Sequence, residues 1–566
     1  MSHPSKSVRL ANIFDIKKYI GISYAGIVVL SLFTIIGVIA ICLCDTSTLA
    51  ILSSDDSFYY FLTARNFVLG NGMSFDGINA TNGFHPLWML ILFPIYSVTG
   101  GEYDLSLRLI YLLLLCLYSG SIALTYILLK SCFGRMSALL SLLLFLNPII
   151  FNLFFNGLES ALEIFLLLLV LNVGRRTDLV SPRMNLRNQA LAGILFGLVF
   201  MSRLDCAFHL MALAGVALIV YRLPIWNPMA LPSLIRSYGL VFIAFALVVT
   251  PYFTWNLVAN GHLSPISGAL KSSFPYPEAR LRALLAVSRA PYTLFIVISV
   301  VIGLIQLSYS GSPLRRLIAS RGEGHAWTVL LTALWLGSLV HYGYTLFFTT
   351  WGTHQWHFAS YVPLILICAA WVFAKLSNGN RFVAYGMALL VISISGGMLF
   401  FSVRLKAKQH GNWDLAADWA RNNTAPGSVF GMTDAGYFAY FSRRNTVNLD
   451  GLINGYEYQE ALTGNTLDEY FERCGIDYIC DYEVRASKVG VHRIMLNRIF
   501  LSEMRNGKRG YEVAFPMDQT IYKSPPYAPY SLKEELSEND KIVFCIWPYD
   551  KGRLTPLPTT PIWTPR

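Results

Sequence analysis

Charged residues are scarce in this chain of 566 residues. Asp, Glu, Lys and Arg make up 14% of it, whereas soluble domains carry about 25%. Hydrophobic residues account for 54%, and the mean hydropathy is +0.49. These values exclude a soluble globular enzyme, a disordered chain and a fibrous protein.

Signatures of nucleotide and zinc sites are also missing. The sequence contains no P-loop and no G-x-G-x-x-G run followed by an acidic residue, so a nucleotide-sugar donor site is unsupported. Its nine cysteines show no zinc-type Cys/His spacing. Six of them lie in or beside apolar segments, whereas Cys474 and Cys480 form a possible disulfide pair in the tail.

The net charge of +11 is confined to the apolar part of the chain. Residues 1–402 hold 24 Lys and Arg against 13 Asp and Glu, and residues 403–566 hold 20 of each. A nucleic-acid partner is therefore not indicated, and the excess of basic residues is interpreted as a signal of membrane topology.

Apolar segments of membrane-spanning length recur through the first 400 residues. They predict an all-α polytopic membrane protein with about 11 transmembrane helices. The first segment lacks a small-residue cleavage site and is expected to remain as an anchor. The predicted spans are 20–44, 104–129, 136–154, 159–174, 189–202, 204–221, 236–256, 290–308, 326–348, 357–375 and 382–402.

The positions of Lys and Arg predict the orientation. With the N-terminus in the cytoplasm, 17 of the 24 basic residues of this region lie on the inner side, provided that the apolar stretch 84–99 does not cross the membrane. The transmembrane domain is then 1–403, with a first outer loop at 45–103. The tail, 404–566, is predicted to be an extracytoplasmic domain.

The tail has the pattern of a small α/β domain. Helices are expected at 413–423, 455–473 and 490–505. Short β-like runs are expected at Ser428–Met432, Thr446–Leu449 and Lys541–Trp547.

Two adjacent carboxylates, Asp55 and Asp56, open a predicted helix in the first outer loop. Ser53 and Asp56 have the spacing of a capping box. The helix is expected to lie on the outer membrane surface on an apolar face of Phe58, Phe61, Leu62 and Leu69. An ionised carboxylate facing water is what a general base needs, although a helix cap alone also accounts for the local pattern.

The wider pattern resembles a known family. The run from Asp55 to Gly72, followed by Thr81-Asn-Gly-Phe-His-Pro-Leu-Trp88, resembles the first outer loop of the GT-C superfamily of glycosyltransferases. Within it, the chain looks most like the bacterial branch that includes the mycobacterial terminal arabinofuranosyltransferases. Weaker matches are Asn156-Gly-Leu-Glu-Ser160, Ser202-Arg-Leu-Asp205, Gly261-His-Leu-Ser-Pro265, Trp419-Ala-Arg-Asn-Asn-Thr, Asp434-Ala-Gly-Tyr-Phe and Asn448-Leu-Asp-Gly451.

The resemblance implies an inverting transferase that uses a polyprenyl-phosphate sugar. It implies a bacterial inner-membrane location and an acceptor that is a glycan, a lipid or a protein. The first acid of the pair usually serves as base in this superfamily, which maps to Asp55, with Asp56 assisting. In related lipid-A aminoarabinose transferases a cation contacts the lipid phosphate, and the matching residue here is His85.

Further candidates come from charge and position. Lys271, Arg280 and His357 could help hold the donor phosphate, as could Arg282 and His354, because a departing phosphate gains negative charge. The alternative for Arg280 and Arg282 is headgroup anchoring, and the alternative for His354 and His357 is an interfacial belt with Trp351 and Trp356. The acceptor candidates are Tyr59, Glu159 and Asp205, and either acid could instead pair with a nearby cation such as Arg203. Tyr59, Tyr60 and Trp88 could stack on sugar rings, although aromatic residues at an interface could instead be membrane anchors.

No resident cofactor is expected, because direct displacement by one base needs none. The two adjacent carboxylates could hold a divalent cation, but the further acidic ligands of the oligosaccharyltransferase relatives are not evident, so a metal is not predicted. Three other functions stay open: a flippase or transporter of lipid-linked glycans, a non-catalytic scaffold, and a glycan polymerase of another fold. A transporter should show charges in the middle of its spans and repeated halves, and Glu163 is the one acid well inside a span.

Overall fold

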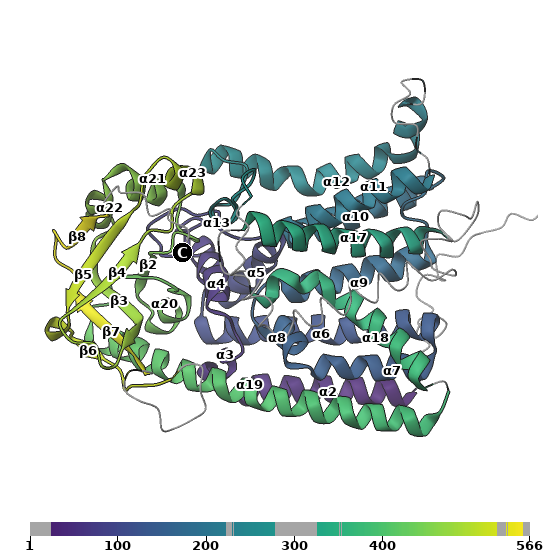
Figure 1. Cartoon of the computed structure of the whole chain (residues 1–566), viewed down its shortest axis with the longest axis horizontal. Coiled ribbons are helices and arrows are strands. Elements are labelled where there is room, and N and C mark those ends of the chain that lie inside the picture. The colour runs from purple at the N-terminus through teal and green to yellow at the C-terminus, as the bar shows by residue number, and fades with distance from the viewer. Residues whose placement is uncertain are drawn as a thin grey trace, which may run out of the picture.

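The computed structural model of the chain describes residues 24–221, 231–277, 325–349, 354–377, 379–528 and 541–557, together with 223, 229, 351 and 539. The helices of residues 24–404 form a bundle, and the strands lie at one end of it (Figure 1).

The bundle consists of helices of very different lengths. Its α-helices are α2 (Tyr24–Leu43), α3 (Thr46–Ala50), α4 (Asp55–Val68), α5 (Pro86–Thr99), α6 (Tyr103–Phe133), α7 (Arg135–Leu142), α8 (Pro148–Phe155), α9 (Ser160–Arg176), α10 (Leu186–Ser202), α11 (Ala207–Tyr221), α12 (Leu231–Asn260), α13 (Ile266–Lys271), α17 (His325–Phe348), α18 (Val362–Ser377) and α19 (Arg381–Asn423). Short 3-10 helices are η2 (Leu143–Leu146), η3 (Leu204–Cys206) and η5 (Gln355–Tyr361).

Within the described residues, six helices are long and apolar enough to cross a membrane, or seven if one bent segment is counted as a span. The chain is thus a multi-pass membrane protein. Helices α9 and α10 have 17 residues each, less than the roughly 20 that a crossing needs, so the predicted number of 11 is not reproduced by length alone. The predicted span 290–308 lies outside the described residues.

The predicted span 136–154 is not one straight helix. Helix α7 with η2 and helix α8 meet at a bend of 68°. Pro148 has no N–H and fits the first turn of a new helix, and the Asn147 side chain caps that turn by accepting the Ile149 N–H at 3.0 Å. The sequence itself therefore breaks the span.

The tail forms two small sheets. The larger has the order β2-β1-β3-β7-β6, in which β2, β1 and β3 are parallel and β3, β7 and β6 antiparallel; the smaller is β4-β5-β8. The strands are β1 (Val429–Met432), β2 (Asn445–Asn448), β3 (Ile476–Arg485), β4 (Val491–Leu496), β5 (Tyr511–Pro516), β6 (Tyr522–Lys523), β7 (Ile542–Pro548) and β8 (Leu554–Pro556). The helices are α20 (Gly436–Ser442), α21 (Tyr456–Gly464), α22 (Leu467–Cys474) and α23 (Leu501–Arg505), with η6 at Met517–Gln519.

Several local predictions for the tail need correction. The segment 413–423 is the end of the 43-residue helix α19. The segment 455–473 splits into α21 and α22 at Asn465, whose φ of 62° ends the first helix. The segment 490–505 is not one helix: it contains strand β4, of six residues, followed by the five-residue helix α23. Cys474 and Cys480 are both buried and unbridged.

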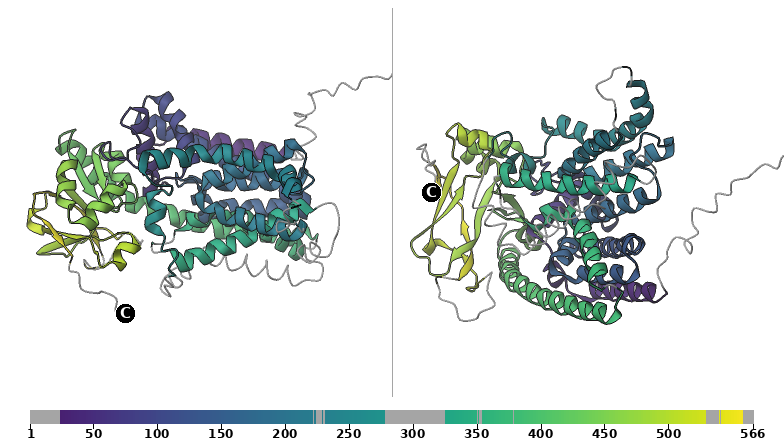
Figure 2. Two further views of the ribbon diagram at one scale, coloured as in Figure 1. Left: turned by 90° about the horizontal axis from the view of Figure 1, so that it is seen from above. Right: turned by 45° about the vertical axis from the view of Figure 1, so that its right-hand side comes forward.

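The tail domain packs directly on the end of the bundle that carries α3, α4 and α13 (Figures 1 and 2). Helix α19 runs the length of the bundle and enters the domain, where it packs against α20 and β7. Helix α20 packs on α4: the ring of Phe58 lies 5.3 Å from that of Tyr437 and 5.0 Å from that of Tyr440. One apolar core therefore runs from the bundle into the tail domain.

Candidate active site

The first-loop helix α4 begins where the sequence predicts, but its surroundings differ from the prediction. Ser54 is its N-cap residue and makes no side-chain cap, and Ser53 instead shares a hydrogen bond of 2.8 Å with the Tyr111 hydroxyl. The expected capping box is therefore absent. The expected apolar face of the helix is not exposed to the membrane surface either, because Phe58 and Phe61 are fully buried, in part against α20.

The Asp55 carboxylate faces the tail domain. Its Oδ2 accepts the N–H of Gly436 at 3.1 Å and its Oδ1 accepts the N–H of Tyr437 at 2.6 Å. Burial and the charge of Asp434 raise the pKa of Asp55, and these two amide bonds oppose the rise. The acid is thus a cap after all, but the helix that it caps is α20.

The Asp56 carboxylate faces a pocket instead. This polar pocket, with a cavity volume of about 60 Å³, lies between α4, the segments before α5 and α9, α13, η5 and the tail domain, which contributes Leu452. Six charged or imidazole side chains line it: Asp56, His85, Glu159, Arg203, Lys271 and His357. Burial raises the pKa of Asp56 to about 6, and the charge of Lys271 opposes the rise.

His85 takes part in the pocket as a neutral donor. Its Nδ1 accepts the Leu204 N–H at 3.2 Å, so the ring proton of the neutral form is on Nε2, which lies 3.7 Å from Glu159 Oε1. Burial lowers the pKa of His85, which favours this neutral form. The position that the resemblance matches to a phosphate-contacting cation thus carries a neutral N–H donor.

A buried ionic network forms one wall of the pocket. Arg203 bonds Glu159 at 2.7 Å and Asp205 through two nitrogens at 3.1 and 2.7 Å, and its Nε lies 3.5 Å from Glu163. His341 lies 3.4 Å from Asp205. The Glu159 Oε2 atom has no hydrogen-bond partner within the described part of the chain. Asp205 does not line the pocket, so its predicted role in acceptor binding is not supported, and the alternative pairing with Arg203 is present.

Two of the remaining candidates for binding the donor phosphate line the pocket, and His354 does not. Lys271, at the end of α13, and His357, in η5, both line the pocket. Burial lowers the pKa of Lys271, while the carboxylate of Asp56 opposes this. His354 instead stacks on Trp356 with ring centroids 4.4 Å apart. Arg280 and Arg282 lie outside the described residues.

The aromatic candidates are engaged by the protein. The Tyr59 hydroxyl accepts the Ala435 N–H at 3.2 Å and the Asn448 amide at 3.0 Å, although Tyr59 also borders the pocket. Trp88 is fully buried, and its indole N–H bonds the Gly157 carbonyl at 3.1 Å. A sugar-stacking role is therefore not supported for Trp88.

The tail supplies acidic residues that the sequence did not mark as functional. Asp450 is fully buried; it accepts the Asp434 N–H at 2.7 Å and pairs with Arg498 at 2.8 Å. Burial and Asp434 raise the pKa of Asp450 to about 7. The matches at Asp434-Ala-Gly and Asn448-Leu-Asp-Gly were the available signal, but nothing in the sequence placed them beside α4.

One group of potential metal ligands occurs among the described residues, namely Glu163, Asp205 and Cys206. The guanidinium of Arg203 lies within hydrogen-bonding or ion-pairing distance of both acids, so both carboxylates are already paired with an arginine. Asp55 and Asp56 are not part of this group.

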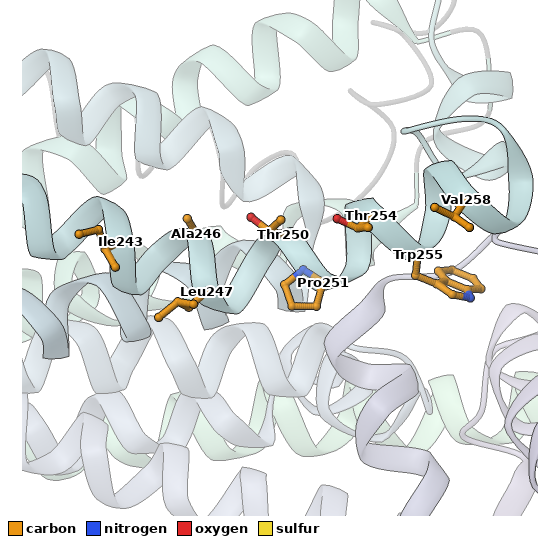
Figure 3. A pocket seen from close by; sticks show the side chains of 8 residues that line it. All are labelled: Ile243, Ala246, Leu247, Thr250, Pro251, Thr254, Trp255 and Val258. Atoms are coloured by element: carbon orange, nitrogen blue, oxygen red, sulfur yellow. The ribbon is translucent and has the colours of Figure 1, made fainter.

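An apolar pocket adjoins the polar one. Gly83 and His85 line the polar pocket, whereas Phe84 and Pro86 line an apolar pocket with a cavity volume of about 320 Å³ between α4, α5, α10 and α12. Pro251 and Trp255 of α12 border this apolar pocket and also an open cleft that runs along the same helix. Leu247, Pro251 and Trp255 point to the same side of α12 (Figure 3). The cleft along α12 therefore borders the apolar pocket, and the apolar pocket borders the polar one.

Comparison with known proteins gives the following matches. A family model described as Domain of unknown function (DUF8728) matches residues 403–531. No curated protein sequence matches the chain. Among solved structures, ArnT from Cupriavidus metallidurans bound to undecaprenyl phosphate is similar with a TM-score of 0.53 at 12% identity, over 93% of this chain and 98% of that one.

Two other solved structures are more distant. Oligosaccharyltransferase AglB from Archaeoglobus fulgidus, in complex with an inhibitory peptide and a dolichol-phosphate, gives a TM-score of 0.44 at 14% identity, over 81% of this chain and 70% of that one. Arabinofuranosyltransferase AftD from mycobacteria gives 0.39 at 13% identity, over 93% of this chain and 40% of that one. The match to ArnT over nearly the whole of both chains shows that this chain has the same fold as ArnT.

Proposed function

We propose that this chain is an inverting membrane glycosyltransferase that moves a sugar from a polyprenyl-phosphate carrier to a glycan, lipid or protein acceptor. The observation that carries the proposal is the polar pocket, in which a carboxylate with a raised pKa, Asp56, faces the cation Lys271 and the donor His85. This pocket opens beside an apolar surface that suits an isoprenoid chain.

The chemistry follows from these groups. The acceptor oxygen forms a bond to the anomeric carbon while the bond between that carbon and the phosphate oxygen breaks. The acceptor proton passes to a carboxylate of the Asp55–Asp56 pair, and the departing polyprenyl phosphate keeps the electron pair. Lys271, the Nε2–H of His85 and His357 stabilise the charge that develops on the phosphate. Attack from the face opposite the phosphate inverts the anomeric centre.

We place the reaction outside the cytoplasm of a bacterial inner membrane, on the side where α4 and the tail domain lie together. The basic residues favour this orientation, because most of those in 1–402 fall on the opposite side. Glu159 and Tyr59 then border the space for the acceptor.

The test is the release of free polyprenyl phosphate from labelled polyprenyl-phosphate sugars by the full chain in nanodiscs, with a crude cell-envelope acceptor. We expect one donor sugar to turn over and its label to move to the acceptor fraction. If no donor turns over, the proposal fails; movement of intact donor between leaflets would then favour the flippase.

A further inference from the structure

The adjacent acids Asp55 and Asp56 occupy different environments, and this difference allows a choice of base. The choice rests on the proposed function. Successive residues of a helix project about 100° apart. As a result Asp55 points to α20 of the tail domain and Asp56 into the polar pocket.

The Asp55 carboxylate is poorly suited to remove a proton. Each of its oxygens already accepts a backbone N–H, from Gly436 or from Tyr437. Such bonds stabilise the ionised form, occupy one lone pair of each oxygen and hold the carboxylate toward α20. The backbones of α20 and α4 also lie close together at this point, since a Cβ added to Gly436 would lie 2.2 Å from the Asp55 carbonyl oxygen. Asp55 does not line the pocket in which the cations lie.

Asp56 differs from Asp55 in its position and its hydrogen bonding, whereas burial raises the pKa of both acids. It lines the pocket with Lys271 and His85, and within the described part of the chain no amide or side chain donates a hydrogen bond to it. Burial raises its pKa to about 6, which makes it a stronger base than an exposed aspartate while it stays largely ionised at neutral pH.

We propose that Asp56, not Asp55, is the general base of the transfer, and that Asp55 is a positioning residue that docks α20 of the tail domain beside the pocket. Asp56 accepts the acceptor hydroxyl proton as the glycosidic bond forms and the bond from the anomeric carbon to the phosphate oxygen breaks. The electron pair leaves with the polyprenyl phosphate. Asp55 holds the tail domain in place, and with it the pocket wall at Leu452.

The first experiment compares Asp56→Asn and Asp55→Asn with the wild-type full chain in nanodiscs, using the donor that the wild type turns over. Removing a general base costs about 10²–10⁴ in rate, so we expect Asp56→Asn to lose at least a hundredfold in kcat with little change in donor KM. The wild-type kcat/KM should fall tenfold per pH unit below about pH 6. Asp56→Asn should lose this acid limb, whereas Asp55→Asn should keep it at a lower plateau.

A second variant decides the matter even if Asp56→Asn does not fold. The charge of Lys271 lowers the pKa of Asp56, whereas the charges that act most on Asp55 are those of Asp434 and Asp56. Lys271→Met should therefore move the acid limb to higher pH if Asp56 is the base, in addition to raising the donor KM. An unmoved limb would overturn the assignment.

Two further outcomes would contradict the inference. One is an Asp56→Asn variant that keeps the wild-type rate and acid limb. The other is an Asp55→Asn variant whose tail domain stays docked, as judged by hydrogen exchange, but whose acid limb is gone. Absence of wild-type turnover would instead refute the proposed function, so the two failures are distinguishable.

Discussion

Replacing Gly436 by alanine tests the docking of the tail domain without altering either acid. Alanine is the better helix former by about 1 kcal/mol, so local propensity alone predicts an equal or more stable helix α20. The structure predicts the opposite, because the added Cβ would meet the Asp55 carbonyl oxygen at 2.2 Å and the Asp55 Oδ2 at 3.2 Å. Since a backbone atom is the obstacle, α20 must move away from α4.

The free-energy cost of moving α20 away follows from the hydrogen bonds that the movement breaks. Separation breaks the amide bonds of Gly436 and Tyr437 to Asp55, and bonds to a charged group contribute about 1.5–3 kcal/mol each. Loss of both would cost about 3–6 kcal/mol. At the lower value the undocked population rises roughly a hundredfold, since about 1.4 kcal/mol corresponds to a factor of ten.

Hydrogen exchange measured on the segment 436–441 in nanodiscs checks this expectation. Gly436→Ala should exchange there roughly a hundredfold faster than the wild type, and Asp55→Asn should behave in the same direction. Gly427→Ala is the matched control, because that exposed turn glycine has no atom within 4 Å of its built Cβ. Unchanged or slower exchange in Gly436→Ala would refute the docking role given to Asp55.

Three other predictions concern the walls of the site. Arg203→Met removes the guanidinium that pairs with Glu159 and Asp205 and should lower the free energy of unfolding by about 3–5 kcal/mol. A lower thermal midpoint would show this loss. The control is Arg421→Met, which removes an exposed pair with Asp418 and should cost less than about 1 kcal/mol. His85→Ala should raise the donor KM by roughly tenfold, the equivalent of one hydrogen bond. Because burial lowers the pKa of His85, the wild-type KM should show no step near pH 6.5. Such a step would mean that the charged form binds the phosphate. Leu90→Trp narrows the apolar pocket beside α5 and should raise the KM of long-chain donors more than that of short-chain ones, whereas Val98→Trp, on the same helix but away from the pocket, should raise neither.

The helical part of the fold was accessible from the sequence because lipid imposes a simple rule. A segment that crosses a bilayer must be apolar over its whole length and must satisfy its own backbone, so composition alone located ten of the described helical segments. The same rule is silent where the segment breaks internally. The bend at Asn147–Pro148 depends on a cap and a missing N–H, which a hydropathy window does not detect.

The tail was harder because short amphipathic segments fit both regular structures. Val491–Leu496 is a strand in which buried positions alternate with exposed ones, yet the run 490–505 also carries residues that favour a helix. Strand pairing decided the outcome: all six residues of β4 pair with β5, a contact between segments that are separated in the chain. Local propensity is overridden by such pairing.

The candidate site shows the same limit most sharply. The sequence located the acid pair, His85 and Lys271, because each lies in a recognisable outer segment. It could not tell Asp55 from Asp56, since both stand in the first turn of one helix and differ only in direction. What separates them is Gly436, nearly 400 residues away, whose missing side chain lets α20 come close enough for its amides to bind Asp55. Once that carboxylate is held, the next residue on the helix is the one left facing Lys271 and His85, and for this reason we propose that the geometry of the tail domain selects the base.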